Sequence, residues 1–405
     1  MRNPGSPGEH PAPAPIAALH PSVRIHLERI SDATGIFQHA VGSTPDPAHG
    51  YCVDDVARAL QVDLLQALRL GWEAVEDSAW RNLRFLQAAF DTDDGRFRNF
   101  LGTDGEWSPK PASDDCQGRA IHALGDAAVA PFDLRHAAAA RTLFRISLPA
   151  TRRLEAPRSI ASVVLGCGAV VRAGGSASVT ATYRRLARRL ATLLETGAGA
   201  YGGTDWPWPE PVLTYENALM PRALIVAGAA LGEDRMRRQG LALLDWLIDV
   251  QVAPDGHFSP IGNTWWPRGE TRSRFDQQPI EATSLIAATQ AAFEVTGDAH
   301  YHDAGERAYA WFLGANDVGF PVADPVRGAC YDGLTARGVN HNQGAESTLM
   351  WLNAAERIGA FRATADAHAQ ETGGVSARLA TRTAAAGVRA EQPVVALRLL
   401  PAPPP

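Results

Sequence analysis

The chain alternates between two kinds of helical segment, and this alternation limits its fold more than any other feature. Amphipathic, charged segments span residues 24–30, 74–90, 134–148, 181–194, 234–250 and 300–313. The other kind is rich in small apolar residues and nearly free of charge. Segments of this kind begin near Asp54, Asp115, Ser159, Glu216, Gln278 and Gln343. Apolar residues three or four apart predict a helix in both kinds of segment.

A helix that is apolar on all sides is buried, whereas a helix with one charged face meets water. The apolar segments recur about every 45–65 residues, which is typical of stacked helical units. Six buried helices inside six amphipathic ones predict an all-α fold, the (α/α)6 barrel, over residues 16–360. We expect a disordered Pro-rich leader at residues 1–15. We expect an Ala/Arg/Pro-rich flexible tail at 361–405, with one short surface segment at 394–400.

The composition excludes several classes of partner. The formal net charge is −6 and no basic run occurs, so nucleic acid and anionic membrane surfaces are not expected partners. No apolar run approaches the roughly 20 residues that cross a bilayer, and the leader lacks the apolar core of a secretory signal. The four cysteines are widely spaced, which favours a reducing, cytoplasmic location.

Acids, amides and aromatic residues gather in the segments that enter the apolar helices. Inner helices of such a barrel all run the same way, so these entrances open at one end and form one bowl. Flat aromatic faces suit sugar rings, and amide and charged groups suit hydroxyls. The predicted substrate-binding residues are His39, Asp54, Arg58, Asp114, Arg119, Trp206, Trp208, Tyr215, Asn263, Trp265, Asp276, Gln277, Gln278, Asn342 and Gln343.

Cleavage of a glycosidic bond usually needs two carboxyl groups, one protonated and one ionised. The predicted catalytic candidates are Asp55, Asp115, Glu210, Glu216, Glu281 and Glu346. We favour Glu210 or Glu216 as the acid and Asp115 or Asp55 as the base. Acids at these positions can also cap helices. In each Asp–Asp pair, one residue can cap while the other faces the bowl.

No metal or cofactor is expected. Cys52 and Cys116 adjoin the paired acids, but their spacing to histidines is not that of a zinc site. No Gly-rich βαβ unit for a nucleotide appears in the sequence.

Five stretches carry a resemblance to a known family: GYCVDDVARAL, SDDCQGRAIHALG, WPWPEPVLTYENALMPRALI, FDQQPIEATS and NQGAESTLMWL. Together they resemble a bacterial family found beside, or fused behind, sugar-nucleotide glycosyltransferases. That family is similar to the six-hairpin glycosidase superfamily, and the resemblance spans Thr34 to Ile358. It implies a carbohydrate substrate and a glycosyltransferase encoded nearby as a partner. The chain departs from the family pattern at Val53 and Val56, where Thr and Asn are expected.

The leading hypothesis is a carbohydrate-active enzyme, an inverting glycoside hydrolase acting on a short oligosaccharide or glycan. A sugar epimerase or isomerase of the same fold is the alternative; two histidines facing each other, such as His39 and His341, would favour it. A non-catalytic glycan-binding partner of a glycosyltransferase is the third reading. The polar mouth disfavours a terpenoid cyclase. The sugar, the linkage, and the choice between water and phosphate as acceptor stay open.

Overall fold

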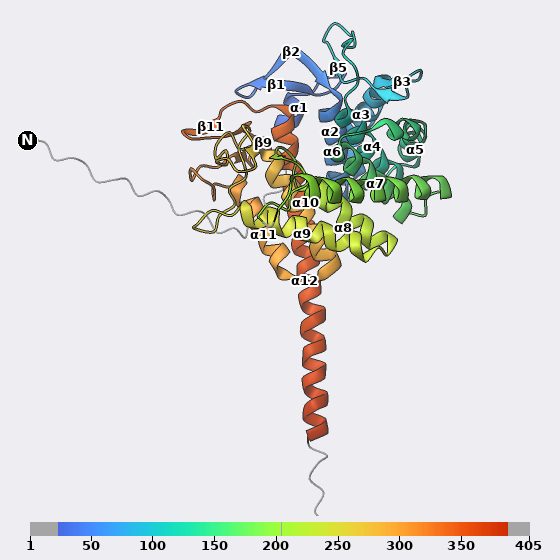
Figure 1. Ribbon diagram of the computed structural model, residues 1–405. Coiled ribbons are helices and arrows are strands. Elements are labelled where there is room, and N and C mark those ends of the chain that lie inside the picture. The colour runs from blue at the N-terminus through green and yellow to red at the C-terminus, as the bar shows by residue number, and fades with distance from the viewer. Residues whose placement is uncertain (1–22, 204, 388–405) are drawn as a thin grey trace, which may run out of the picture. The chain divides into compact units, whose positions relative to one another are not determined.

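The apolar segments form the inner helices of a barrel (Figure 1). The computed structural model describes residues 23–203 and 205–387, with side chains through residue 370. The chain divides into two units, Met1–Phe361 and Arg362–Pro405. The inner helices are α2 (Val53–Leu70), α4 (Asp114–Val129), α6 (Pro157–Arg172), α8 (Leu219–Leu231), α10 (Pro279–Thr296) and α12 (Ala345–Gly387).

The amphipathic segments form the outer layer. Its helices are α1 (Ile25–Arg29), α3 (Glu76–Ala89), α5 (Leu134–Ser147), α7 (Ala177–Tyr201), α9 (Asp234–Val250) and α11 (Ala299–Phe312). Each helix from α3 to α11 in this layer packs on the inner helix that precedes it in the chain. Their charged faces stay in water, while residues such as Leu83, Leu190 and Leu244 are fully buried.

Contacts between successive inner helices run from α2 through α4, α6 and α8 to α10. Helix α12 closes the ring on both sides. Thr283 of α10 donates a hydrogen bond to the Met350 carbonyl at 2.9 Å, and Arg69 of α2 pairs with Glu356 at 2.7 Å. The predicted (α/α)6 barrel is confirmed.

Glycines bring α4 and α6 into backbone contact. A Cβ atom on Gly125 would lie 2.4 Å from the Gly166 carbonyl oxygen, and one on Gly118 would lie 2.7 Å from that of Ser159. Larger residues at these positions would push the two helices apart. The small residues of the apolar segments therefore set the width of the barrel beside Asp115.

Short strands and 3-10 turns connect the helices. A three-stranded antiparallel sheet has the order β1 (Phe37–Val41), β2 (Thr44–Cys52), β5 (Phe100–Leu101), and lies where α2 begins (Figure 1). The two-stranded pairs are β3 (Phe90–Asp91) with β4 (Arg96–Phe97), β6 (Val212–Leu213) with β7 (Trp266–Pro267), β8 (Ala323–Asp324) with β9 (Ala329–Cys330), and β10 (Gly333–Thr335) with β11 (Gly338–Asn340). The turns are η1 (Trp72–Ala74) and η2 (Leu148–Arg153).

The structure describes part of the predicted C-terminal tail but not the predicted leader. The leader at residues 1–15 and the segment 394–400 lie outside the described residues. Helix α12 continues through Gly387, so residues 361–387 are helical where we expected a flexible tail. Ala and Arg, which dominate that composition, are strong helix formers. None of the described helices combines the length and the apolarity needed to cross a bilayer.

Candidate active site

Carboxylates collect where the inner helices begin. Asp54 and Asp55 lie in the first turn of α2, Asp114 and Asp115 in that of α4. Glu281 and Glu346 lie in the first turns of α10 and α12, and Glu216 comes just before α8. All these ends point the same way, so the acids meet at one mouth of the barrel.

Arg119 of α4 joins three of these acids. Its guanidinium lies 2.9 Å from Asp54 and 2.7 Å from Glu216, and 3.8 Å from the Asp115 carboxylate. Asp54 belongs to α2 and Glu216 precedes α8, so this one side chain spans the mouth. The Oδ1 atom of Asp54 is buried and has no hydrogen-bond partner among the described residues.

Arg58 of α2 joins a second group of acids. It lies 3.0 Å from Asp55 on its own helix and 2.8 Å from Glu346 of α12. The Arg58 and Asp55 side chains are each 8% exposed, whereas Glu346 is 39% exposed. The two arginines thus hold acids of four inner-helix ends in a single layer across the mouth.

The segment Tyr215–Asn217 links two further acids through its side chains and backbone. The Tyr215 hydroxyl donates to Asp115 at 2.5 Å. The Glu216 amide donates to Glu281, and the Asn217 side chain donates to Glu281 at 3.0 Å. Glu216 adopts φ of +46°, a left-handed conformation that is uncommon outside glycine. Such strain persists only where the surroundings enforce it, and here Glu281 and Arg119 do so.

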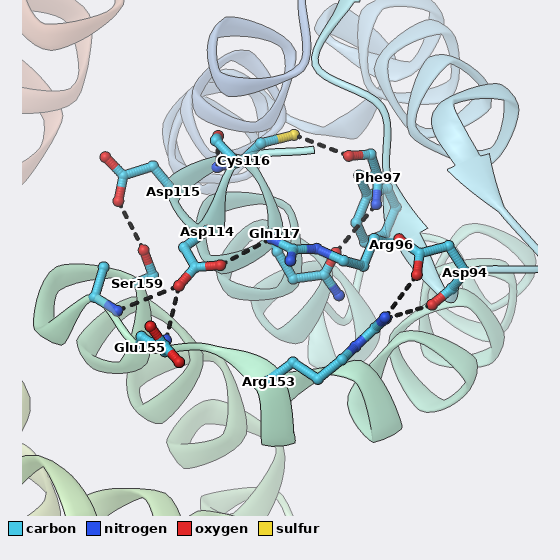
Figure 2. Close-up of polar contacts among 12 residues, drawn as sticks. Asp94, Arg96, Phe97, Asp114, Asp115, Cys116, Gln117, Arg153, Glu155 and Ser159 are labelled. Carbon is cyan, nitrogen blue, oxygen red and sulfur yellow. Dashed lines mark hydrogen bonds and ion pairs between the residues drawn. The ribbon is translucent and has the colours of Figure 1, made fainter. Parts of the chain in front are cut away.

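Asp114 and Asp115 are neighbours in sequence but contact different partners, as Figure 2 shows. Asp114 turns toward β4 and the start of α6. It pairs with Arg96 at 2.9 Å and accepts from the backbone amides of Glu155 and Ala156. Asp115 points elsewhere and accepts from the Ser159 hydroxyl at 2.7 Å. Asp114 therefore anchors α6, and only Asp115 is placed for the predicted role at the mouth.

Two acids have pKa values near neutrality. Burial raises the pKa of Asp55 to about 7, with the Glu346 charge adding to the effect and Arg58 opposing it. Burial likewise raises the pKa of Glu281 to about 7, against the hydrogen bonds that it accepts. The pKa of Asp115 lies below its usual value, since Arg119, Tyr215 and Ser159 outweigh the effect of burial. The mouth therefore combines acids that can hold a proton at pH 7 with an ionised one.

A small cavity lies inside the barrel beneath this layer. Arg58, Arg119 and Glu216 line it, together with His122 of α4, Arg222 of α8 and Arg357 of α12. Its volume is about 50 Å³, which is enough for bound water. Burial lowers the pKa of His122 to about 4, so this imidazole is neutral at pH 7.

The predicted aromatic rim is largely core. Trp206 and Trp208 are 3% and 0% exposed and pack in a cluster with Trp246 and Trp266. A side chain with no free surface cannot stack on a ligand, so this placement differs from the predicted one. Trp265 is 44% exposed and has φ of +66°, and the half-buried Tyr215 borders the mouth through its bond to Asp115.

Several predicted polar residues serve the architecture. Gln277 is fully buried and bonds to Trp311, Arg274 and Asp317. Glu210 pairs with Arg158 at 2.8 Å beneath the loop before α8. The polar atoms of Gln277 are engaged within the protein, so it does not fit the predicted role at the bowl. Glu210 places Oε1 on Arg158, and its buried Oε2 has no hydrogen-bond partner among the described residues.

The remaining predicted residues lie in the loops. Gln278 is the N-cap residue of α10, and Asn342 accepts from the Gly42 amide at 3.1 Å. Gln343 is buried, and its side-chain oxygen has no partner among the described residues. Three residues are exposed: His39, Asn263 and Asp276, the last with φ of +59°.

The sequence did not single out Arg158, Ser159, Asn217, Arg222 or Arg357. Arg158 donates to Glu210, Asn217 and the Tyr215 carbonyl and so fixes the loop before α8. Arg222 and Arg357 line the cavity. The sequence does contain a signal for the three arginines, because charged residues are unusual in segments that are otherwise apolar.

No known protein family profile and no curated protein matches this chain. Solved structures do match its fold. A sugar epimerase from a ruminal bacterium aligns with a TM-score of 0.64 at 13% identity, over 83% of this chain and 94% of that one. A D-mannose isomerase aligns with a TM-score of 0.62 at 11% identity, over 84% of this chain and 95% of that one.

A GH76 α-mannanase from Bacteroides thetaiotaomicron aligns with a TM-score of 0.55 at 10% identity, over 78% of this chain and 88% of that one. At such identities the likeness concerns the fold alone. This chain therefore has the (α/α)6 toroid fold of the epimerases, and its chemistry must be argued from its own residues.

Proposed function

We propose that the protein is a carbohydrate-active enzyme, an inverting glycoside hydrolase whose acid is Asp55 and whose base is Glu216. These roles reverse those favoured from the sequence, because burial raises the pKa of Asp55. Proteins of the same fold include a GH76 α-mannanase and sugar epimerases, which supports a sugar substrate. The observation that carries the proposal is the position of these two carboxyl groups at the mouth.

Asp55 and Glu216 belong to opposite sides of the ring, because α2 and α8 are three steps apart in the order α2–α4–α6–α8. Each carboxyl rests one oxygen on an arginine, Asp55 on Arg58 and Glu216 on Arg119. Within the described residues, no hydrogen bond occupies the second oxygen of either carboxyl. Asp115 differs, since both of its oxygens are bonded.

The chemistry follows from this placement. Asp55, with its pKa near 7, holds a proton that it gives to the leaving glycosidic oxygen. Glu216 lines the water-sized cavity and takes a proton from a water that attacks the opposite sugar face. Glu281 and Asp115 are positioning residues, because they bind the backbone and the side chain of the segment that carries Glu216.

Activated substrates separate the two roles. A nitrophenyl glycoside needs little help from an acid, so Asp55→Asn should retain activity on it while losing about 10²–10⁴-fold on a natural oligosaccharide. Glu216→Gln should lose activity on both substrates, and azide should restore it with inverted product. NMR of the first product should show inversion at C1. The exposed Glu73 is the matched control, and Glu73→Gln should behave as wild type.

Equal rate losses on both substrates for Asp55→Asn would contradict its role as acid. Full activity of Glu216→Gln would contradict the role of Glu216 as the base. Retention of configuration would overturn inversion, since a retaining enzyme uses its second carboxylate as a nucleophile.

A second candidate is a sugar isomerase or epimerase, favoured by the cavity itself. Glu216 is the one carboxylate among the described residues that line it, and neutral His122 and four arginines accompany it. The predicted histidine pair is not its basis, because His39 contacts His49 and His341 contacts Tyr331. Incorporation of deuterium at C2 of a free sugar in D₂O, lost in His122→Asn, would select this reaction.

A further inference from the structure

Four arginines line the central cavity, and they fall into two pairs. Arg58 and Arg119 near the mouth each contact at least two carboxylates within 4 Å. Arg222 of α8 and Arg357 of α12 have no carboxylate within that distance among the described residues. The Arg357 guanidinium donates to Asn353 at 2.7 Å. Arg222 and Arg357 therefore carry two positive charges with no carboxylate within 4 Å among the described residues.

Such an arrangement is costly without a counter-ion. Burial lowers the pKa of Arg222 to about 9, and the like charge of Arg357 lowers it further in the same direction. Burial also lowers the pKa of Arg357. Both side chains are half-buried. A charge partly removed from water without a partner is costly, so the pair is explained best by a ligand that brings negative charge.

The nearby acids are engaged elsewhere. Asp126 accepts from Gln61 at 2.8 Å and lies 3.8 Å from His122. Glu216 is held by Arg119, and the exposed Glu294 accepts from Gln290. None of them pairs directly with Arg222 or Arg357, so the protein does not supply the missing anion from its own described residues.

We propose that Arg222 and Arg357 form a phosphate-binding site within the cavity. A phosphate carries about −1.5 to −2 charges near pH 7, which matches two guanidinium groups. The forked donors of arginine fit its oxygens bidentately. Ser162 and Asn353 line the same cavity and add a hydroxyl and an amide. The volume of about 50 Å³ is enough for bound water, which a small oxyanion would displace.

The site goes beyond the proposed hydrolysis and does not depend on it. Inorganic phosphate bound here would occupy the position of the attacking water. The bond from C1 to the leaving oxygen would then break as a bond from C1 to a phosphate oxygen forms. Asp55 would give its proton to the leaving oxygen, and the products would be a glycosyl phosphate and a shortened sugar. A phosphate carried by the sugar substrate itself would use the same two arginines.

Thermal melting and calorimetry test the site directly. Millimolar sodium phosphate should raise the Tm of the full chain above its value in sodium chloride of equal ionic strength. Arg222→Met and Arg357→Met should each weaken phosphate binding at least about tenfold. Both variants should melt no lower than wild type without phosphate, because a half-buried charge without a carboxylate partner is removed. Arg184→Met, an exposed outer-helix change, should leave phosphate binding intact.

Comparison of inorganic phosphate with hexose 6-phosphates as ligands distinguishes a free ion from a phosphorylated sugar. Binding of inorganic phosphate supports a free ion, and production of glycosyl phosphate from an oligosaccharide then shows that it is the acceptor. Binding of hexose 6-phosphates alone supports a phosphorylated substrate. Absence of any Arg222-dependent binding with both probes overturns the site. Glu216→Gln should bind phosphate at least as tightly as wild type, because it removes a negative charge from the lining of the same cavity. Failure of the hydrolase proposal would therefore leave the phosphate site standing.

Discussion

The two Asp–Asp pairs look alike in sequence but are used differently. In the first pair, both acids face arginines at the mouth, Asp54 toward Arg119 and Asp55 toward Arg58. In the second, Asp114 turns away to hold β4 and the start of α6, while Asp115 meets Tyr215 and Ser159. The pairs also differ in acidity, because the pKa of Asp55 is raised while those of Asp114 and Asp115 are lowered. Position in the motif therefore does not determine the role of an acid.

The largest expected difference is between Asp55→Asn and Asp114→Asn. The first should reduce turnover of an unactivated oligosaccharide by about 10²–10⁴-fold, since it removes the proton donor. The second should lower the free energy of unfolding by about 2 kcal/mol, because a charged group that accepts from Arg96 and two amides is lost. Urea unfolding and initial rates measure both. An inactive but fully stable Asp114→Asn would reverse the assignment.

Tyr215→Phe should have the next largest effect. It removes a hydrogen bond that favours the ionised form of Asp115, so the pKa of that carboxyl should rise. Activity should then fall at a higher pH on acidification than in wild type, because protonated Asp115 no longer helps to hold the segment that carries Glu216. Measurement of kcat/KM against pH checks this. Ser159→Ala should act in the same direction. A uniform loss at every pH would indicate a purely structural contact.

Stability should depend on pH with opposite signs in the two pairs. The folded pKa of Asp55 lies above its unfolded value, so its contribution is present at low pH and is lost as the pH rises toward 7. Asp114, with its lowered pKa, contributes above its unfolded pKa and loses that contribution on acidification. Asp55→Asn should flatten the decline in unfolding free energy between about pH 4 and 7. Asp114→Asn should flatten the decline below about pH 4. Parallel curves for both variants would contradict these environments.

The smallest effect is expected for Asp54→Asn. Arg119 keeps Glu216 as a partner, and the Asp54 side chain is 20% exposed. We expect a stability change below about 1 kcal/mol and a loss of activity below tenfold. Chemical denaturation and steady-state kinetics measure both. A loss as large as that of Asp55→Asn would show that the pair acts as a unit.

The fold could be predicted because helix periodicity is local and each apolar segment announces its own burial. Arrival of the acids at one mouth followed from the common direction of the inner helices. The β1–β2 hairpin gave no such signal, since its second strand, TPDPAHGYC, contains two prolines and lacks a regular alternation. Val53 and Val56, which depart from the family pattern, are both fully buried, so that departure falls in the core.

The partners of the site residues could not be predicted. Arg119 and Glu216 are 97 positions apart, and no local pattern records their contact. The tryptophans before α8 looked like a sugar-binding rim because they stand among prolines. In the structure, Trp246 and Trp266 cover Trp206 and Trp208, which is a tertiary contact that loop composition does not reveal.

At position 216, the residue that best fits the left-handed backbone differs from the residue that the proposed reaction needs. Glycine adopts such a conformation without the steric penalty of a side chain, so a search for heat-resistant variants should repeatedly select Gly or Asn at this position. Those variants would outlast the parent on heating and yet lose the carboxylate. Selection for thermal tolerance alone would then remove the proposed base, so a search for variants that are both stable and active must hold Glu216 fixed.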